Sequence, residues 1–451
     1  MIKYETNSKL VSEGQIFIAI KGHTVDGHDY IEEAIKNGAS KIISEKELNI
    51  EIPYEVVENT NEYLKKVLVE EYSETINKAN LIGVTGTNGK TTTCYLAYQL
   101  LKKLGKNVAY LGTIGFYHND KVITLNNTTP DILNLYKYLI DAVTNGAEYI
   151  VMEVSSHALS FERIAGLKFS VGGFTNLTED HLDYHKTMEA YLEEKLKLNN
   201  YLKDTATLIL NNDDESSKRF MTFKNYLTLG INGDYKIVNY SIQPDHTDLE
   251  FSFKGKNYNV KTNLTSKFNI YNYLTCIAAI HSLGFSIEEI IETTKNIYPP
   301  KGRCETYKVL NGYAVVDYAH TPDAVEKVIL AYSEFRKNRI ITIVGCGGDR
   351  DPMKRPIMGD VATKLSDYVI FTNDNPRTED PKKIMNDIVK NNNSTNYEII
   401  YDRKEAIIKG INMLEQDDIL LILGKGHEDY QIIGRTKIHF DDAEIVKSFI
   451  K

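Results

Sequence analysis

The segment TGTNGKTT, at residues 85–92, has the residue types that hold a polyphosphate. It follows the apolar run of residues 81–84 and opens an expected helix, so backbone N–H groups of the turn and the helix N-terminus can bind phosphate oxygens. Lys90 would meet the β- and γ-phosphates, and Thr91 a magnesium ion. The general phosphate-loop pattern has glycine six residues before the lysine, where this chain has Val84. We therefore predict a variant nucleotide loop and the use of ATP.

Two side chains further along the sequence are candidate metal or phosphate contacts. Glu153 ends the apolar run of residues 149–152, and parallel sheets place their sites at the carboxyl ends of strands. His181 stands between Asp180 and Asp183, and a neighbouring carboxylate can fix the tautomer of an imidazole. The pattern alone leaves open that His181 is a capping or core histidine.

The elements that must position these residues fall into three blocks, at residues 1–78, 79–299 and 300–451, with the second boundary at the breaker PPKG of residues 299–302. In the first block we expect strands at 15–20 and 41–44 around a helix at 30–37. In the second we expect strands at 81–84, 108–111, 149–154, 169–174 and 207–210, helices at 91–104, at 269–283 and after Ser286, and a hairpin that turns at residues 254–256.

In the third block, strands at 313–316, 340–344, 368–372, 398–400 and 419–423 alternate with helices from Thr321, after Pro381 and at 403–413. Strands that alternate with helices predict largely parallel sheets covered on both faces. The fold class is therefore α/β, with a small first domain, a central domain like a P-loop ATPase and a Rossmann-like third domain.

Composition excludes several classes of function. The net charge is -9 and no long basic run occurs, which argues against nucleic acid or an anionic membrane as a partner. The four cysteines lack CxxC spacing, so neither a zinc site nor a disulfide framework is indicated. The N-terminus has no apolar signal core, and no run of about 18 apolar residues occurs. We expect a cytoplasmic monomer.

The chain resembles the Mur ligase family over essentially its whole length. TGTNGKTT is that family's nucleotide loop, and EVSSH at 153–157, TNL at 175–177, DHLDYH at 180–185, KFNIYN at 267–272, Gly302-Arg303 with Glu305, and DYAH at 317–320 follow in the family's order. The resemblance implies a ligase that activates a carboxylate with ATP as an acyl phosphate, which an amine then attacks with release of phosphate. Cations must bring the triphosphate and the carboxylate together.

Three further segments, CGGDRD at 346–351, DNPRTED at 374–380 and GKGHEDYQ at 424–431, resemble the branch that adds the third residue of the peptidoglycan stem peptide. Its substrates would be UDP-N-acetylmuramoyl-L-alanyl-D-glutamate and meso-2,6-diaminopimelate. By resemblance, Arg377 of DNPR would meet the distal carboxylate of diaminopimelate, a charge-assisted bond that L-lysine cannot make. From the pattern alone, Arg377 could instead cap the following helix. The same reaction with L-lysine, or with meso-lanthionine, which is also a diacid, is the alternative.

The resemblance also implies roles for individual residues. ATP would contact Gly86, Thr87, Asn88, Gly89, Lys90, Thr91, Thr92, Asn269, Arg303, Asp317, His320 and Arg403. Magnesium would be held by Thr91, Glu153, His181 and a carbamate on Lys195, with Lys90, Glu153, His181 and Lys195 as the catalytic set. The amino acid would contact Arg355, Asp374, Asn375, Pro376, Arg377, Gly424 and Glu428.

The UDP-muramoyl substrate would contact Ser8, His23, Thr24, Asn127, Thr128, Thr129, Ser155 and Arg163. The sequence departs from the family at two places in this set. Asn7-Ser8-Lys9 replaces the usual Asp-Ser-Arg, so the bidentate fork of arginine is lost. Phe161 replaces a common glutamine, so one polar contact is missing. For Arg163, the pattern alone also allows a surface ion pair.

Two other classes fit the sequence less well. A nucleotide-dependent switch would need a base-recognition motif such as NKxD after the loop, and none follows. A folate-polyglutamylating ligase of the same family is disfavoured by the long first domain and by DNPR.

Overall fold

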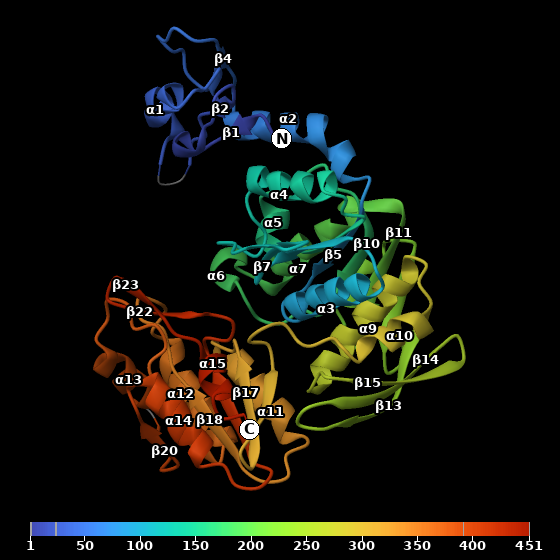
Figure 1. Ribbon diagram of the computed structural model, residues 1–451, viewed down its shortest axis with the longest axis vertical. Helices are drawn as coiled ribbons and strands as arrows, with labels where there is room; N and C mark the ends of the chain where they lie inside the picture. The colour runs from blue at the N-terminus through green and yellow to red at the C-terminus, as the bar shows by residue number, and fades with distance from the viewer. Residues whose placement is uncertain (1, 23–24, 391, 451) are drawn as a thin grey trace. The chain divides into compact units, whose positions relative to one another are not determined.

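The computed structural model describes residues 2–22, 25–390 and 392–450. It divides into two compact units, Met1–Thr228 with Thr275–Ser286, and Leu229–Leu274 with Ile287–Lys451. Strands alternate with helices in both units (Figure 1), which confirms the predicted α/β class. Within those described ranges, no helix is long and apolar enough to cross a membrane.

The first unit begins with a small parallel sheet in the order β1-β2-β3-β4. Its elements are β1 (Tyr4–Glu5), β2 (Ile16–Ile18), α1 (Ile31–Lys36), β3 (Lys41–Ser44), β4 (Tyr54–Val56) and α2 (Thr60–Ile76). The sequence analysis did not anticipate α2. The Asn59 side chain caps this helix by accepting hydrogen bonds from the N–H groups of Asn61 and Glu62.

A larger sheet of the same unit carries the nucleotide loop. Its strands β5 (Asn80–Thr85), β6 (Val108–Gly112), β9 (Tyr149–Glu153), β10 (Phe169–Phe174) and β11 (Leu202–Asn211) are parallel in the order β11-β10-β5-β9-β6. The antiparallel strands β7 (Gly115–His118) and β8 (Lys121–Ile123) extend the sheet beyond β6. The central β5 is therefore buried between neighbours, as its apolar run predicts.

Helices cover both faces of this sheet (Figure 1). They are α3 (Lys90–Lys103), α4 (Ile132–Thr144), α5 (Ser156–Ser160), α6 (Leu182–His185), α7 (Met188–Leu196) and α8 (Ser217–Phe220). Strand β6 shows the two faces: Ala109 and Leu111 share a core with α4, whereas Tyr110 lies against Tyr95 and Tyr98 of α3. Alternate strand residues therefore point to opposite helical layers.

In the second unit, the predicted hairpin is confirmed. Strand β14 (Thr247–Phe253) pairs antiparallel with β15 (Lys256–Thr262), with Phe251 opposite Tyr258 and Phe253 opposite Lys256. Strand β13 (Tyr235–Ile242) pairs with the other edge of β14, and β12 (Tyr226–Gly230) pairs with β13. The helices α9 (Lys267–Ser282) and α10 (Ile287–Thr294) follow.

The rest of the second unit is a doubly wound sheet in the order β16-β17-β21-β18-β19-β20, parallel except for β16. Its elements are β16 (Glu305–Val309), β17 (Gly312–Asp317), α11 (Pro322–Ser333), β18 (Ile340–Val344), α12 (Lys354–Leu365), β19 (Tyr368–Phe371), α13 (Pro381–Val389), β20 (Tyr397–Ile399), α14 (Arg403–Asn412), β21 (Ile419–Leu423), the hairpin β22 (Tyr430–Ile433) with β23 (Thr436–His439), and α15 (Asp442–Lys447). Two apolar cores lie on opposite faces. One contains Ile340 and Val344 with α11 to α13, and the other contains Ile341 and Ile343 with α14 and α15.

Candidate active site

The nucleotide loop connects β5 to α3 and folds back on itself. Lys90 Nζ donates to the carbonyl oxygens of Gly86, at 2.9 Å, and Thr87, at 2.8 Å. Gly89 adopts a left-handed conformation with φ of 87°, and a Cβ atom at Gly86 would lie 2.0 Å from Thr175 Oγ1. Both glycines are therefore required by the shape of the loop.

The segment that follows β10 anchors this loop from the side. Thr175 Oγ1 donates to the Asn88 carbonyl at 2.6 Å, and the Thr87 N–H donates to the Asn176 carbonyl at 2.8 Å. The Asn88 N–H donates to Asn176 Oδ1 at 3.0 Å. The TNL motif at 175–177 thus fixes the backbone that would surround the phosphates.

Glu153 ends β9, next to β5, and its carboxylate is 0% exposed. Thr91 Oγ1 donates to Glu153 Oε2 at 2.9 Å, so the predicted pair of magnesium ligands lies together. A carboxylate and a hydroxyl are hard oxygen donors of the kind that magnesium prefers, and the donor set therefore fits this ion.

Lys195, on α7, reaches the same loop. Its Nζ donates to the Gly86 carbonyl at 2.8 Å and lies 4.1 Å from the centre of the Tyr191 ring. No carboxylate lies within ion-pair distance of this nitrogen in the part of the chain that the structure describes. Burial and the nearby charge of Lys90 lower the pKa of Lys195 well below its usual value. The fold therefore favours a neutral amine at this position.

His181 precedes α6 in a left-handed conformation, with φ of 54°, and its side chain is half exposed. Its Nε2 lies 3.5 Å from Asp180 Oδ2, and its ring centre is 5.1 Å from that of His157 and 6.2 Å from that of Tyr191. His181 and Lys195 thus flank the same tyrosine. Among the described residues, no group of three or more His, Cys, Asp or Glu side chains is arranged to hold a metal.

Three of the residues predicted to contact the UDP-muramoyl substrate, Thr129, Ser155 and Arg163, lie close to the backbone of Glu153. Thr129 Oγ1 donates to the Glu153 carbonyl at 2.9 Å and lies 3.3 Å from Ser155 Oγ. Arg163 Nη1 donates to the Thr129 carbonyl at 2.7 Å, and its guanidinium lies 5.4 Å from the centre of the exposed Phe161 ring.

The remaining predicted contacts of this substrate are more dispersed. Thr128 Oγ1 is 3.0 Å from Thr113 Oγ1, and Asn127 is exposed just before it. In the small sheet, the buried Ser8 hydroxyl donates to Glu33 Oε2. The predicted contacts His23 and Thr24 lie outside the described residues.

In the second unit, the predicted nucleotide residues Arg303, Asp317 and His320 lie close to one another around Tyr318. Asp317 accepts hydrogen bonds from the N–H groups of Cys304 and Ala319, both at 2.8 Å, and burial raises its pKa. The Arg303 guanidinium lies 4.9 Å from the centre of the Tyr318 ring, and His320 Nδ1 is 2.8 Å from the Tyr318 carbonyl. Asn269 Nδ2 donates to the Thr265 carbonyl at 2.8 Å.

Arg403 has a different environment. It is 1% exposed, and its guanidinium donates to both carboxylate oxygens of Asp442, at 2.8 and 2.6 Å, and to the Leu423 carbonyl. Its Nη1 has no hydrogen-bond partner among the described residues. Groups of the protein itself therefore surround the Arg403 guanidinium.

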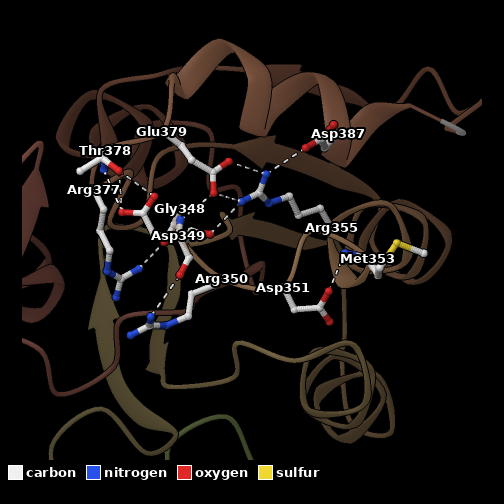
Figure 2. A network of polar contacts seen from close by, with 11 residues as sticks. Gly348, Asp349, Arg350, Asp351, Met353, Arg355, Arg377, Thr378, Glu379 and Asp387 are labelled. Carbon is white, nitrogen blue, oxygen red and sulfur yellow. Dashed lines mark hydrogen bonds and ion pairs between the residues drawn. The ribbon is translucent and has the colours of Figure 1, made fainter. Parts of the chain in front are cut away.

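The segments CGGDRD and DNPRTED lie side by side in a polar network (Figure 2). Arg377 adopts a left-handed conformation, with φ of 51°, and its Nη1 donates to the Gly348 carbonyl at 2.8 Å. Asp349 accepts hydrogen bonds from both the N–H and the hydroxyl of Thr378, which joins the two loops. No carboxylate pairs with Arg377 within the described ranges.

Arg355 is a buried member of this network. It is 1% exposed and donates to both oxygens of Glu379, at 2.9 and 2.8 Å, and to Asp387 at 2.9 Å (Figure 2). Arg350, which the sequence analysis did not select, is exposed and donates to the Asp349 carbonyl at 3.1 Å. Figure 2 shows its guanidinium on the same side of the loops as that of Arg377.

The other predicted amino-acid contacts meet at the end of β21. Asn375 Nδ2 donates to Glu428 Oε2 at 2.8 Å, and the fully buried Lys425 bridges Glu428 and Asn375 at 3.0 and 3.2 Å. A Cβ atom at Gly424 would lie 2.8 Å from Asp374 Oδ2, and one at Gly348 would lie 1.9 Å from the Pro376 carbonyl. Lys425 was also not selected from the sequence, although it stands inside GKGHE.

Comparison with known proteins identifies the family. Residues 4–78 match the Mur ligase family catalytic domain, 84–280 the Mur ligase middle domain, and 302–426 the glutamate ligase domain of Mur ligases. The chain is 42% identical, over 99% of its length and 94% of the relative's, to UDP-N-acetylmuramoyl-L-alanyl-D-glutamate–2,6-diaminopimelate ligase 1 of Clostridium acetobutylicum. It is 43% identical, over 98% of its length and 92% of the relative's, to UDP-N-acetylmuramoyl-L-alanyl-D-glutamate–2,6-diaminopimelate ligase of Fusobacterium nucleatum.

A solved structure agrees with the sequence matches. The structure of a UDP-N-acetylmuramoyl-L-alanyl-D-glutamate–2,6-diaminopimelate ligase aligns with 99% of this chain and 94% of its own, with a TM-score of 0.71 and 32% identity. The matched domains cover most of the chain, in the order expected from its motifs. The chain belongs to the Mur ligase family of amide-bond-forming ligases.

Proposed function

We propose that the chain uses ATP to join meso-2,6-diaminopimelate to the D-glutamate of UDP-N-acetylmuramoyl-L-alanyl-D-glutamate. The observation that carries the proposal is Arg377, whose guanidinium contacts a carbonyl and no carboxylate in the described residues. A guanidinium without a carboxylate partner in the protein can donate hydrogen bonds to a carboxylate of the substrate. Full-length relatives at 42% and 43% identity are named for this reaction, which supports the choice.

The reaction has two steps. A carboxylate oxygen of the D-glutamate attacks the γ-phosphorus of ATP, and ADP leaves as the acyl phosphate forms. An amine of diaminopimelate then attacks the acyl carbon, the C–O bond to phosphate breaks, and phosphate leaves with an amide in its place. The first step brings two anionic groups together, so fixed cations and dipoles supply most of the catalysis.

The nucleotide loop provides those groups in the first unit. Gly86 to Gly89 would surround the phosphates with backbone N–H groups, Lys90 would stabilise the transferred phosphoryl group, and Thr92 would lie at the start of α3. Thr91 and Glu153 would hold Mg²⁺, which would screen the repulsion between phosphate and carboxylate. Thr128, Thr129, Ser155 and Arg163 would orient the dipeptide carboxylate, and Asn127 and Ser8 would contact the same substrate.

Lys195 would act as a carbamate. Its nitrogen would add to CO₂ and lose a proton, which converts a buried amine into a carboxylate-like anion. The lowered pKa of Lys195 supports this step because only the neutral amine is a nucleophile. With His181, the carbamate would supply ligands for a second Mg²⁺.

In the second unit, Asn269, Arg303, Asp317 and His320 would contact the nucleotide, with Arg403 near the adenine. Arg377 would bind the distal carboxylate of diaminopimelate. Glu428 would face an ammonium of the amino acid, held by Asn375, and Asp374, Pro376 and Gly424 would shape the rest of the pocket.

The network in Figure 2 refines the role of Arg355. Its guanidinium is bound by Glu379 and Asp387, so we assign it to holding the loops rather than to the substrate. Arg350 is the second cation on the side of Arg377. It would have the role of substrate contact that was first predicted for Arg355. An exposed guanidinium on Arg350 and a partly buried one on Arg377 suit an amino acid with two carboxylates.

We further propose domain boundaries at 78/79 and 299/300, a monomeric state and a cytoplasmic location. The four cysteines are buried free thiols, in keeping with a reducing compartment. Meso-lanthionine, a diacid with a thioether bridge, is the second candidate substrate because Arg377 would bind either diacid.

A substrate panel tests the proposal. Purified protein with ATP, Mg²⁺ and the UDP-muramoyl dipeptide should release phosphate with diaminopimelate far faster than with L-lysine. Arg377→Ala should lower this preference by roughly ten- to a hundredfold, because it removes a charge-assisted hydrogen bond worth about 1.5–3 kcal/mol. Arg336→Ala is the matched control, because Arg336 is an exposed arginine paired with Asp367. An unchanged ratio in Arg377→Ala would refute the assignment of Arg377.

A further inference from the structure

The Glu153 carboxylate is held by more groups than the nucleotide loop supplies. Tyr110 OH and the Thr113 N–H both donate to Oε1 at 2.8 Å. Thr91 Oγ1 donates to Oε2 at 2.9 Å, and Thr113 Oγ1 lies 3.2 Å from the same oxygen. One oxygen thus has two donors from β6 and the segment after it, while the other faces Thr91.

Tyr110 is itself rigidly placed. It is 0% exposed in the middle of β6, and its ring packs against those of Tyr95, Tyr98 and Tyr117 with centre-to-centre distances of 5.7, 6.1 and 5.6 Å. Edge-on and tilted ring contacts at these distances are favourable. The Tyr110 hydroxyl is the donor of its hydrogen bond with Glu153, because the Glu153 carboxylate can only accept.

Gly112 shows how closely the backbone fits around this bond. A Cβ atom at that position would lie 2.1 Å from Glu153 Oε1 and 2.4 Å from the Tyr110 hydroxyl oxygen. Only glycine leaves room for the tyrosine and the carboxylate to meet. The hydrogen bond is thus supported by the strand, the aromatic cluster and the turn at the end of β6.

We infer that Tyr110 is a positioning residue, whose hydroxyl holds Glu153 Oε1 so that Oε2 is turned toward a divalent cation shared with Thr91. The inference rests on the proposed role of Glu153 as a magnesium ligand. Groups that orient a metal-binding side chain commonly contribute ten- to a hundredfold to metal affinity. Because the Thr113 N–H would remain after loss of Tyr110 OH, we expect the lower part of that range.

Tyr110→Phe removes the hydroxyl and leaves the ring. Binding of Mn²⁺ in the presence of ADP, measured by electron paramagnetic resonance on the full chain, should weaken by about tenfold relative to the wild type. The half-saturating Mg²⁺ concentration for phosphate release should rise by a similar factor, and most of the rate should return at high Mg²⁺. A residue with a purely structural role would lower kcat without this shift in metal dependence.

Tyr98→Phe is the control, since Tyr98 belongs to the same aromatic cluster and no hydrogen bond joins its hydroxyl to Glu153. It should bind Mn²⁺ as the wild type does. Equal Mn²⁺ affinity in the wild type and Tyr110→Phe would overturn the inference while leaving the metal site intact. Absence of ADP-dependent Mn²⁺ binding in the wild type would instead refute the metal site on which the inference rests. Equal weakening in both variants would overturn the specific role of Tyr110.

Discussion

The two units each bury a long basic side chain in a region predicted to be functional, but in opposite electrostatic settings. Lys195 is 1% exposed and contacts the Gly86 carbonyl and the Tyr191 ring, with no carboxylate at ion-pair distance among the described residues. Arg355 is equally buried and is bound by Glu379 and Asp387. Both residues were predicted as site residues from the sequence.

This difference distinguishes a buried side chain that can react from one that supports the structure. A buried cation without a counter-ion is unfavourable, so the fold favours its neutral form and leaves a reactive amine. A buried cation bound by two carboxylates is already satisfied, and removal of the cation leaves two carboxylates without it. Lys195 therefore has the setting of a group that is modified or reacts, and Arg355 has the setting of a group that holds two loops together.

The largest effect is expected from Lys195→Met. The variant cannot form the proposed carbamate and so would lack an anionic ligand of the proposed second cation, whose contribution would be several kcal/mol, so kcat should fall by at least about a hundredfold. Phosphate release in a bicarbonate-free buffer and after bicarbonate addition measures the effect. Bicarbonate should activate the wild type and not the variant.

The lowered pKa of Lys195 also sets the direction with pH. As the pH falls through that pKa, the amine takes a proton and can no longer add to CO₂, so activation by bicarbonate should fade toward acid pH. Lys197→Met is the control, because Lys197 is an exposed lysine paired with Glu194. Equal loss of activity in both variants would contradict the special role of Lys195.

The contrast also explains which parts of the site were predictable. The nucleotide loop could be predicted because its residues are contiguous and lie between a buried strand and a helix. Thr91 and Glu153 come together because β5 and β9 are parallel neighbours. No such signal marks Tyr110, because an aromatic residue in a buried strand is most simply explained as part of the core. Its hydrogen bond to Glu153 depends on the pairing of β6 with β9.

The choice between Arg350 and Arg355 shows a second limit of sequence reasoning. The two arginines are five residues apart, and the motif alone does not tell which one faces a ligand. The start of α12 determines which arginine is buried. The helix begins at Lys354 and directs Arg355 inward toward α13, while Arg350 stays in the preceding loop. The helix α2 was also missed. Among its apolar side chains, only Leu64, Leu68 and Ile76 are buried.

Arg355→Met sharpens the comparison with a smaller effect. Without the guanidinium, Glu379 and Asp387 lose their cation, and unfolding in urea should show a loss of about 3 kcal/mol. This is the low end of the usual cost, because both carboxylates are partly exposed. The KM for diaminopimelate should also rise as the loop that carries Arg377 loosens.

Arg336→Met is the control for stability, since its exposed pair with Asp367 is worth at most about 1 kcal/mol. If Arg355→Met kept wild-type stability but lost the preference for diaminopimelate over lysine, Arg355 would be a substrate contact, as the sequence first suggested. The assignment of Arg350 to that role would then be wrong.

The smallest effect is expected at Phe161, where the resemblance to the family predicts that one polar contact with the substrate is missing. The ring is about half exposed and lies near Arg163 and Tyr184. Phe161→Gln would restore one neutral hydrogen bond to the UDP-muramoyl dipeptide, worth about 0.5–1.5 kcal/mol, and should lower its KM by roughly two- to tenfold. Initial rates at varied dipeptide concentration measure this change. Phe161→Ala, which removes the ring without adding a donor, should not lower KM. If glutamine and alanine had the same effect, the ring at this position would matter only through its bulk, and the missing polar contact would have no part in substrate binding.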